Sequence, residues 1–314
     1  MSAASIEVLG LTKNYSRGRS ALVDASFRYE GTGAIGYLGP NGAGKTTTLK
    51  LLTGLLRPTR GTARINGISV VKDRKAALAD VGAIIESPEP YPSQTVAEAI
   101  DMVGEFRGGR PADIAREIGE LNAKLDLPPL TARCGQLSKG QRQRVSIAAS
   151  LIRDPRVIIL DEPTSGLDPK ERILIRNLLI ELKKDRLILM SSHLMQEVTE
   201  ICDQVIFINQ GQVILKDSVE NVARRFQTRA VDVEFDTPIH IDRIRALGGA
   251  VREVTVVAER RFRITFDGST AARVEILRGL VGLGPVLSYQ SASLVLEDAY
   301  LALMQGDDAR AVTA

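Results

Sequence analysis

The stretch GPNGAGKT, Gly39 to Thr46, has a lysine and a threonine at the spacing G-x-x-x-x-G-K-[ST]. It follows a short apolar run and precedes residues with helical spacing, so it leads from a strand into a helix N-terminus. Backbone N–H groups of such a loop converge on phosphate oxygens, and the helix dipole adds to their field. Lys45 is expected to reach the β- and γ-phosphates of a bound nucleotide, and Thr46 to bind Mg²⁺. The expected nucleotide-binding residues are Gly39, Pro40, Asn41, Gly42, Ala43, Gly44, Lys45, Thr46 and Thr47.

Two acids end a second apolar run, RVIILDEP, which reads as a buried parallel strand whose carboxyl end faces a site. We expect Asp161 to hold Mg²⁺ through water and Glu162 to polarise the water that attacks the γ-phosphate. The run RLILMSSH is also an apolar stretch typical of a buried parallel strand, and it ends at His193.

The pentapeptide LSKGQ opens a helical stretch and decides the resemblance. With the loop and acids above, it makes residues 5–220 resemble the ATPase subunit of an ABC (ATP-binding cassette) transporter. The resemblance implies that a signature segment contacts the ATP bound to a second copy of the chain. Ser138 and Gly140 lie at the start of a helix, where they can donate hydrogen bonds to a phosphate. It further implies that Glu162, His193 and Lys45 are catalytic and that Tyr15 stacks on adenine. The signature segment is Leu137, Ser138, Lys139, Gly140 and Gln141, and the family's D-loop corresponds to Ser165, Gly166, Leu167 and Asp168.

One position departs from the family pattern, because Glu86 stands in VGAIIESPEPY where most members have a glutamine. A carboxylate can still bind Mg²⁺ or water through oxygen, but it lacks the amide's donor capacity. Gln94 is the alternative residue for this role. The segment IIESP is similar in sequence to the corresponding segment in the ATPases of bacitracin-type drug or peptide exporters.

The resemblance implies a homodimer bound to a separate membrane permease, on the cytoplasmic face of the membrane, that exports a drug, antibiotic, peptide or lipid-like substrate. ATP and Mg²⁺ are the implied cofactors, and no nucleic acid is expected. The alternative is a soluble ABC ATPase that acts on nucleic acid or ribosomes. Such relatives usually carry two cassettes or a long coiled-coil insertion, and this chain has neither pattern.

The elements that position these residues indicate an α/β P-loop ATPase with a β-rich N-terminal subdomain and a helical subdomain over about 87–155. The first helix is expected to end near Pro58. We expect the ATPase domain to span 1–225 and a small α+β domain to span 229–314. The order βαββαβ in the latter fits a ferredoxin-like unit, closed by an amphipathic helix at LVLEDAYLALM. Dimer support or regulation is its implied role, and a passive appendage is the alternative.

Composition agrees with an ordinary globular protein of roughly two domains. The chain has 314 residues, 44% hydrophobic and 25% charged, with a formal net charge of +3. So small a net charge gives no electrostatic case for a nucleic-acid surface. Two cysteines are too few for a disulfide framework, which indicates a reducing, cytosolic compartment. Neither a membrane-spanning run nor a signal-peptide pattern is evident.

Overall fold

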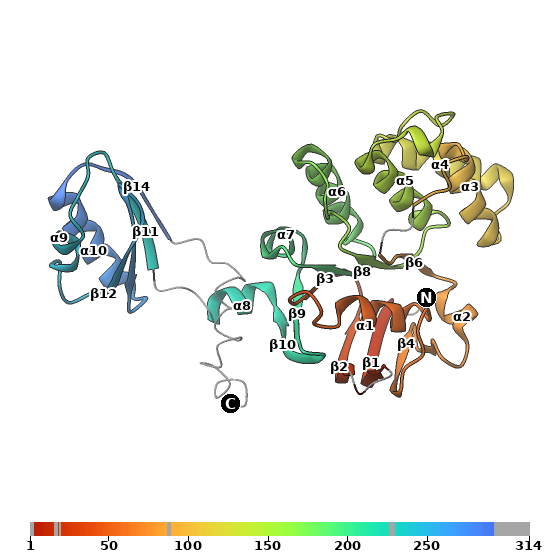
Figure 1. Cartoon of the computed structure of the whole chain (residues 1–314), viewed down its shortest axis with the longest axis horizontal. Helices are drawn as coiled ribbons and strands as arrows, with labels where there is room; N and C mark the ends of the chain where they lie inside the picture. The colour runs from red at the N-terminus through yellow and green to blue at the C-terminus, as the bar shows by residue number, and fades with distance from the viewer. Residues whose placement is uncertain (1–2, 16–17, 19, 87–88, 226–229, 292–314) are drawn as a thin grey trace. The chain divides into compact units, whose positions relative to one another are not determined.

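The computed structural model describes residues 3–15, 18, 20–86, 89–225 and 230–291 (Figure 1). The chain divides into two compact units, Met1–Val219 and Glu220–Ala314. The sequence placed this division between residues 225 and 229. Helix α8 (Val219–Arg225) therefore begins at the division.

A six-stranded sheet forms the centre of the first unit, in the order β10-β9-β3-β8-β7-β6. All neighbours are parallel except β10, which pairs antiparallel with β9. The carboxyl ends of β3, β7 and β8 consequently meet at one edge, where the phosphate loop, the two acids and His193 follow them. The strands are β3 (Gly33–Leu38), β6 (Val81–Ile84), β7 (Val157–Asp161), β8 (Leu187–Ser192), β9 (Gln204–Asn209) and β10 (Gln212–Ser218).

An antiparallel sheet of order β2-β1-β4-β5 makes up the predicted β-rich N-terminal part. Its inward residues share one hydrophobic cluster with helix α1 and the larger sheet, as Val8, Leu49 and Ile159 illustrate. This packing fixes α1, the helix that follows the phosphate loop, between the two sheets. The strands are β1 (Ser5–Asn14), β2 (Ser20–Glu30), β4 (Arg60–Ile65) and β5 (Ile68–Ser69).

Helix α1 (Lys45–Leu52) is shorter than predicted. The sequence placed its end near Pro58, but Gly54 adopts a left-handed backbone with φ 66°. A glycine in that conformation is a common helix stop. The glycine therefore ends the helix before the proline is reached.

Helices cover the remainder of the first unit. The predicted helical subdomain contains α3, α4 and α5, and Gly108, with φ 74°, lies in the break between α3 and α4. A capping box of Thr95 and Glu98 starts α3, with Thr95 Oγ1 accepting from Glu98 N at 3.2 Å. The helices are α2 (Arg74–Leu78), α3 (Val96–Phe106), α4 (Pro111–Leu125), a 3₁₀ turn (Cys134–Gln136), α5 (Lys139–Leu151), α6 (Pro169–Leu182) and α7 (Met195–Ile201).

The second unit has the predicted βαββαβ order, and its antiparallel sheet runs β12-β13-β11-β14. This is the ferredoxin-like arrangement. Phe262 and Ile264 of the sheet pack with Ile276 and Leu280 of α10 in a separate core. The predicted helix at LVLEDAYLALM lies outside the described residues. The elements are β11 (Ala230–Phe235), α9 (Ile241–Arg245), β12 (Val251–Ala258), β13 (Arg261–Phe266), α10 (Thr270–Leu283) and β14 (Val286–Ser291).

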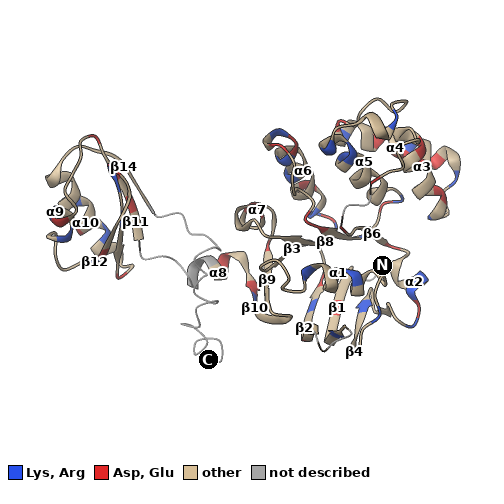
Figure 2. Cartoon of the chain, viewed as in Figure 1, with Lys and Arg blue, Asp and Glu red and all other residues tan. Residues whose placement is uncertain are grey.

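Charged residues of both signs alternate along the same elements, for example on α6 (Figure 2). Cys134 and Cys202 are buried free thiols, and burial raises the pKa of each. Within the described ranges, no helix combines the length and apolar character needed to cross a lipid bilayer.

Candidate functional site

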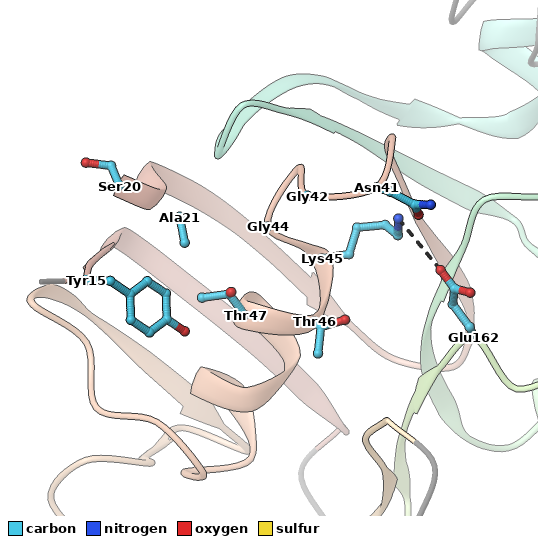
Figure 3. Close-up of a pocket in the computed structure, with 10 residues that line it drawn as sticks. All are labelled: Tyr15, Ser20, Ala21, Asn41, Gly42, Gly44, Lys45, Thr46, Thr47 and Glu162. Atoms are coloured by element: carbon cyan, nitrogen blue, oxygen red, sulfur yellow. Dashed lines mark ion pairs between the residues drawn. The ribbon is translucent and has the colours of Figure 1, made fainter. Parts of the chain in front are cut away.

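A cavity of about 370 Å³ opens above the phosphate loop (Figure 3). That volume falls within the range of small-molecule sites. Its walls come from the end of β1, the start of β2, the loop, the first turn of α1 and the residue after β7. The lining residues are Tyr15, Ser20, Ala21, Asn41, Gly42, Gly44, Lys45, Thr46, Thr47 and Glu162.

Glycines in the phosphate loop are required by both conformation and space. Gly42 and Gly44 have φ of 82° and 107°, in the left-handed region that side chains disfavour. A Cβ on Gly44 would lie 2.4 Å from the carbonyl oxygen of Ala21, and one on Gly39 would lie 2.3 Å from that of Ile208. The loop therefore sits tightly against β2 and β9, and these contacts hold its shape.

Lys45 is the buried cation of the cavity, with 5% of its surface exposed. Its Nζ donates to the carbonyl oxygens of Gly39 at 2.8 Å and Pro40 at 3.3 Å. Glu162 Oε1 lies 3.8 Å from the same nitrogen. Burial lowers the pKa of Lys45, and the charges of Glu162 and Asp161 offset part of that effect. A desolvated ammonium held this way is available to an incoming anion.

Ser191 of β8 organises both acids at the end of β7. Its Oγ donates to Asp161 Oδ1 at 2.5 Å, and Glu162 N donates to that Oγ at 3.0 Å and to the Ser191 carbonyl at 3.2 Å. Asp161 is 6% exposed, so its orientation is fixed by this contact. The sequence analysis missed Ser191, although a hydroxyl at the end of an otherwise apolar strand was the available signal.

His193 contacts the second acid directly. Its Nδ1 lies 3.1 Å from Glu162 Oε2. An ionised carboxylate only accepts, so the contact favours the tautomer in which Nδ1–H donates to Glu162. The structure therefore brings together Lys45, Asp161, Glu162 and His193, as predicted from their separate motifs.

Glu86 lies beside the acids through its main chain. Its N–H donates to Asp161 Oδ2 at 3.4 Å, while its carboxylate pairs with Lys50 Nζ at 2.5 Å. The alternative residue, Gln94, is elsewhere: its Nε2 donates to Met102 Sδ at 3.4 Å. Gln94 lines a separate, mostly apolar cavity of about 230 Å³ between β6, α3 and α5. Of the two candidates, only Glu86 adjoins the acids.

Tyr15 lines the cavity with 42% of its surface exposed. Lys13 Nζ lies 5.4 Å from the centre of its ring and donates to the Arg57 carbonyl at 2.8 Å. This cation–π contact holds the ring from one side. Lys13 was not singled out from the sequence, because nothing in its spacing distinguishes it from a surface lysine.

The signature segment contributes none of the described residues that line the cavity. Ser138 caps α5: its Oγ accepts from Gln141 N at 3.2 Å, and Gln141 Oε1 accepts from Ser138 N at 2.9 Å. Gly140 is needed because a Cβ there would lie 2.7 Å from Glu171 Cγ. The cap uses the N–H groups of Ser138 and Gln141, whereas those of Lys139 and Gly140 lie in the same first turn, where N–H groups can bind an anion.

The predicted D-loop connects the acids to α6. Asp168 Oδ1 accepts from Glu171 N at 2.9 Å and caps that helix, while Leu167 is buried. Gly166 has φ 68°, and a Cβ there would meet Lys139 Nζ at 2.2 Å. The D-loop and the signature segment are therefore in contact within one chain. Ser165 begins this turn, its N–H donating to the Glu162 carbonyl at 3.1 Å.

Comparison with known proteins shows the family of the chain. A family model for the ABC transporter matches residues 22–165. The uncharacterized ABC transporter ATP-binding protein YhcH of Bacillus subtilis (strain 168) is 36% identical over 219 residues, which span 69% of this chain and 70% of that protein. The chain belongs to the ABC transporter ATP-binding proteins.

Two further ABC proteins extend the comparison. The fluoroquinolones export ATP-binding protein of Mycobacterium tuberculosis (strain CDC 1551) is 34% identical over 232 residues, covering 73% of this chain and 76% of that protein. A dimeric post-hydrolysis ATP-binding cassette bound to ADP and Pi has a TM-score of 0.63 at 24% identity, over 68% of this chain and 98% of that one, and shows the shared fold. The predicted ABC ATPase fold and ATPase class are confirmed.

Proposed function

We propose that this ABC ATPase binds and hydrolyses ATP in the cavity above the phosphate loop and thereby powers export through a separate membrane permease. The observation that carries the proposal is the set of contacts joining Lys45, Glu162 and His193 beside a preformed loop. The export direction is supported by the mycobacterial relative, which is named for the export of fluoroquinolones. A drug, antibiotic, peptide or lipid-like molecule is the substrate class.

ATP fits the cavity by charge and shape. The loop amides and Lys45 would hold the phosphates, because the ammonium can exchange the Gly39 and Pro40 carbonyls for phosphate oxygens. Tyr15 would take the adenine on the ring face away from Lys13. Thr47 and Asn41 complete the polar lining.

Mg²⁺ fits the donor set, which consists of oxygens only. Thr46 lines the cavity, and Asp161, fixed by Ser191, directly precedes the lining residue Glu162, so a hydroxyl and a carboxylate would hold the ion. The described residues hold no group of three or more His, Cys, Asp or Glu side chains that could bind a metal alone. Mg²⁺ needs few protein ligands, because it completes its coordination shell with waters and phosphate oxygens. When bound, it would neutralise charge on the phosphates.

Glu162 is the residue placed to orient and polarise the attacking water. The Nδ1–H of His193 holds its carboxylate from one side, and Ser191 anchors its main chain. Because Lys45 neutralises charge on the phosphates while Glu162 acts on water, binding and hydrolysis use different side chains.

The complete site requires two chains. Since the signature segment lies outside the cavity of its own chain, the N–H groups in the first turn of α5 would reach the γ-phosphate held by a partner. A head-to-tail pair closed by a two-fold axis gives two equivalent sites. The dimeric state of the structurally similar cassette supports this arrangement.

The permease is expected to dock on the helical subdomain at the cytoplasmic face of the membrane. The apolar cavity lined by Ala83, Val103 and Val145 offers a seat for a helix of the permease. Tyr91 and Phe106, 63% and 83% exposed, add apolar surface in the same subdomain. The second unit, which carries none of the nucleotide-site motifs, is proposed to hold the two ATPase units near each other.

Transport is tested by expressing the chain with a candidate membrane permease and measuring ATP-driven uptake of candidate substrates into inside-out vesicles. Uptake should need ATP and should disappear with Glu162→Gln. Uptake that persists without ATP, or that Glu162→Gln leaves unaffected, would contradict the exporter assignment.

A further inference from the structure

Two glutamates occupy matching positions beyond neighbouring strands of the parallel sheet. In the register of β6 with β7, Ile84 lies opposite Leu160, and Glu86 and Glu162 each follow two residues later. Both have a left-handed backbone, with φ of 64° and 47°. Non-glycine residues rarely adopt this conformation, and those that do gather at functional sites.

Each glutamate pairs with a lysine of α1. Glu162 Oε1 lies 3.8 Å from Lys45 Nζ, and Glu86 Oε1 lies 2.5 Å from Lys50 Nζ. Lys50 is four residues beyond Thr46, so the two side chains share one face of the helix, a single turn apart. The carboxylate of Glu86 is therefore bound to a lysine that lies on α1 one helical turn beyond Thr46, whose hydroxyl is proposed to hold Mg²⁺.

Charge explains why such a pair is useful at this edge of the sheet. Glu86, Asp161 and Glu162 bring negative charge to a cavity proposed to take a triphosphate, and unpaired carboxylates would repel it. Lys50 neutralises Glu86, which has the most exposed side chain of the three acids. The exposed fraction is 64% for Glu86 and 28% for Glu162. A pair this exposed is weak and so can exchange readily.

We propose that Lys50 is a positioning residue: it holds the Glu86 carboxylate on the second turn of α1 and so limits how far the charge of this carboxylate acts on the nucleotide and metal bound near Thr46. The inference rests on the proposed nucleotide site. It assigns to Lys50 no contact with the phosphates, so its effect must pass through Glu86.

The test compares the binding of a fluorescent ATP analogue in Mg²⁺ and in EDTA, in the full-length chain. The measured quantity is the ratio of the Kd in EDTA to the Kd in Mg²⁺. Lys50→Gln should raise this ratio about three- to fivefold, because the freed carboxylate repels the metal-free nucleotide and favours the metal-bound one. Lys50→Arg keeps the charge and should leave the ratio within about twofold of wild type.

The coupling to Glu86 distinguishes positioning from direct contact. In a Glu86→Gln background, Lys50→Gln should change the ratio by less than about twofold. A matched control is Lys183→Gln, which breaks the Lys183–Asp203 pair of 2.7 Å, whose side chains are 21% and 48% exposed. That variant should leave the ratio unchanged. Melting curves without nucleotide check that every variant is folded.

Two results would overturn the inference: an unchanged ratio in Lys50→Gln, or an equal change with and without Glu86. If Lys50→Gln does not fold, Glu86→Gln removes the same pair and should lower the ratio, and no change would overturn the inference. Lys45→Ala separates this from failure of the site itself. If Lys45→Ala binds the analogue as tightly as wild type, the proposed nucleotide site is wrong, whereas weak binding with no Lys50–Glu86 coupling rejects only the role of Lys50.

Discussion

His193 Nδ1 and Glu162 Oε2 lie 3.1 Å apart, across the ends of the neighbouring strands β8 and β7. Glu162 also follows β7 with a left-handed backbone, φ 47°, and its N–H is bound to Ser191. The carboxylate is therefore constrained from both its side chain and its main chain. Such constraint suits a group that must orient one water molecule.

Separate variants should divide binding from hydrolysis. Glu162→Gln keeps the size of the side chain but removes its basicity, so kcat should fall by about 10²–10⁴ while ATP affinity stays within about twofold. Lys45→Ala should instead weaken ATP binding by about tenfold or more, since a charge-assisted contact is lost. Equilibrium binding and steady-state hydrolysis measure the two effects. Wild-type hydrolysis by Glu162→Gln would exclude its proposed role.

Mixed dimers should reveal a shared active site. Lys45→Ala disables the phosphate loop, and Ser138→Arg blocks the signature segment. In each homodimer both sites are therefore damaged and no intact site remains. A heterodimer of the two retains one complete site and should hydrolyse ATP at about half the wild-type rate. Two affinity tags on the two chains allow the heterodimer to be purified. Hydrolysis by the mixed dimer no faster than by either parent would argue against sharing.

Burial of Lys45 should couple ATP binding to proton uptake. Its pKa lies below the ordinary 10.5 because of burial, so part of Lys45 is neutral in the free protein at alkaline pH. A bound triphosphate favours the ammonium and raises that pKa, so a proton is taken up and affinity falls as pH rises. Calorimetry in two buffers of different ionisation enthalpy measures the uptake. Lys45→Arg, charged throughout, is the control that should show none from this position.

The phosphate loop could be predicted from the sequence because its determinants are neighbours along the chain: glycines that accept positive φ and one lysine. The acids at the end of β7 were likewise predictable, since an apolar run ending in acids reads as a buried parallel strand. The helix end at Gly54 differs from the predicted end near Pro58, because both residues can stop a helix and the left-handed glycine comes first along the chain.

Other contacts could not be predicted, because they depend on how distant segments align. The Lys50–Glu86 pair needs the position of α1 against β6, and the role of Ser191 needs the register of β8 against β7. Neither is encoded in spacing along the chain. The same holds for the contact of Gly140 with Glu171, which joins α5 to α6.

Two glycine-to-alanine changes should have opposite effects on stability. Gly140→Ala would place its Cβ 2.7 Å from Glu171 Cγ, and Glu171 is held by Arg144 at 3.0 Å, so it cannot easily withdraw. Overpacking of this kind costs about 1–3 kcal/mol and should lower the melting temperature by about 2–10 °C. In α4, a Cβ on Gly119 meets open space, so Gly119→Ala should raise the melting temperature slightly. A lower melting temperature for Gly119→Ala would contradict this account of helix α4.

Removal of the second unit should spare the chemistry and weaken the dimer. The nucleotide-site residues all lie within Met1–Val219, and the second unit has a core of its own built on Phe262, Ile264 and Leu280. A chain ending at Gln227 should therefore bind ATP with unchanged affinity. Its specific activity should fall more steeply on dilution than that of the full chain, because separated protomers lack complete sites.

Hydrolysis measured across a dilution series, with sedimentation at the same concentrations, tests this prediction. The full-length Glu162→Gln chain is the control for association without turnover. Identical concentration dependence of the truncated and full-length proteins would show that the second unit does not hold the dimer together. Faster hydrolysis by the truncated chain at every concentration would instead identify that unit as an inhibitor, because release of an inhibitory contact does not depend on how often protomers meet.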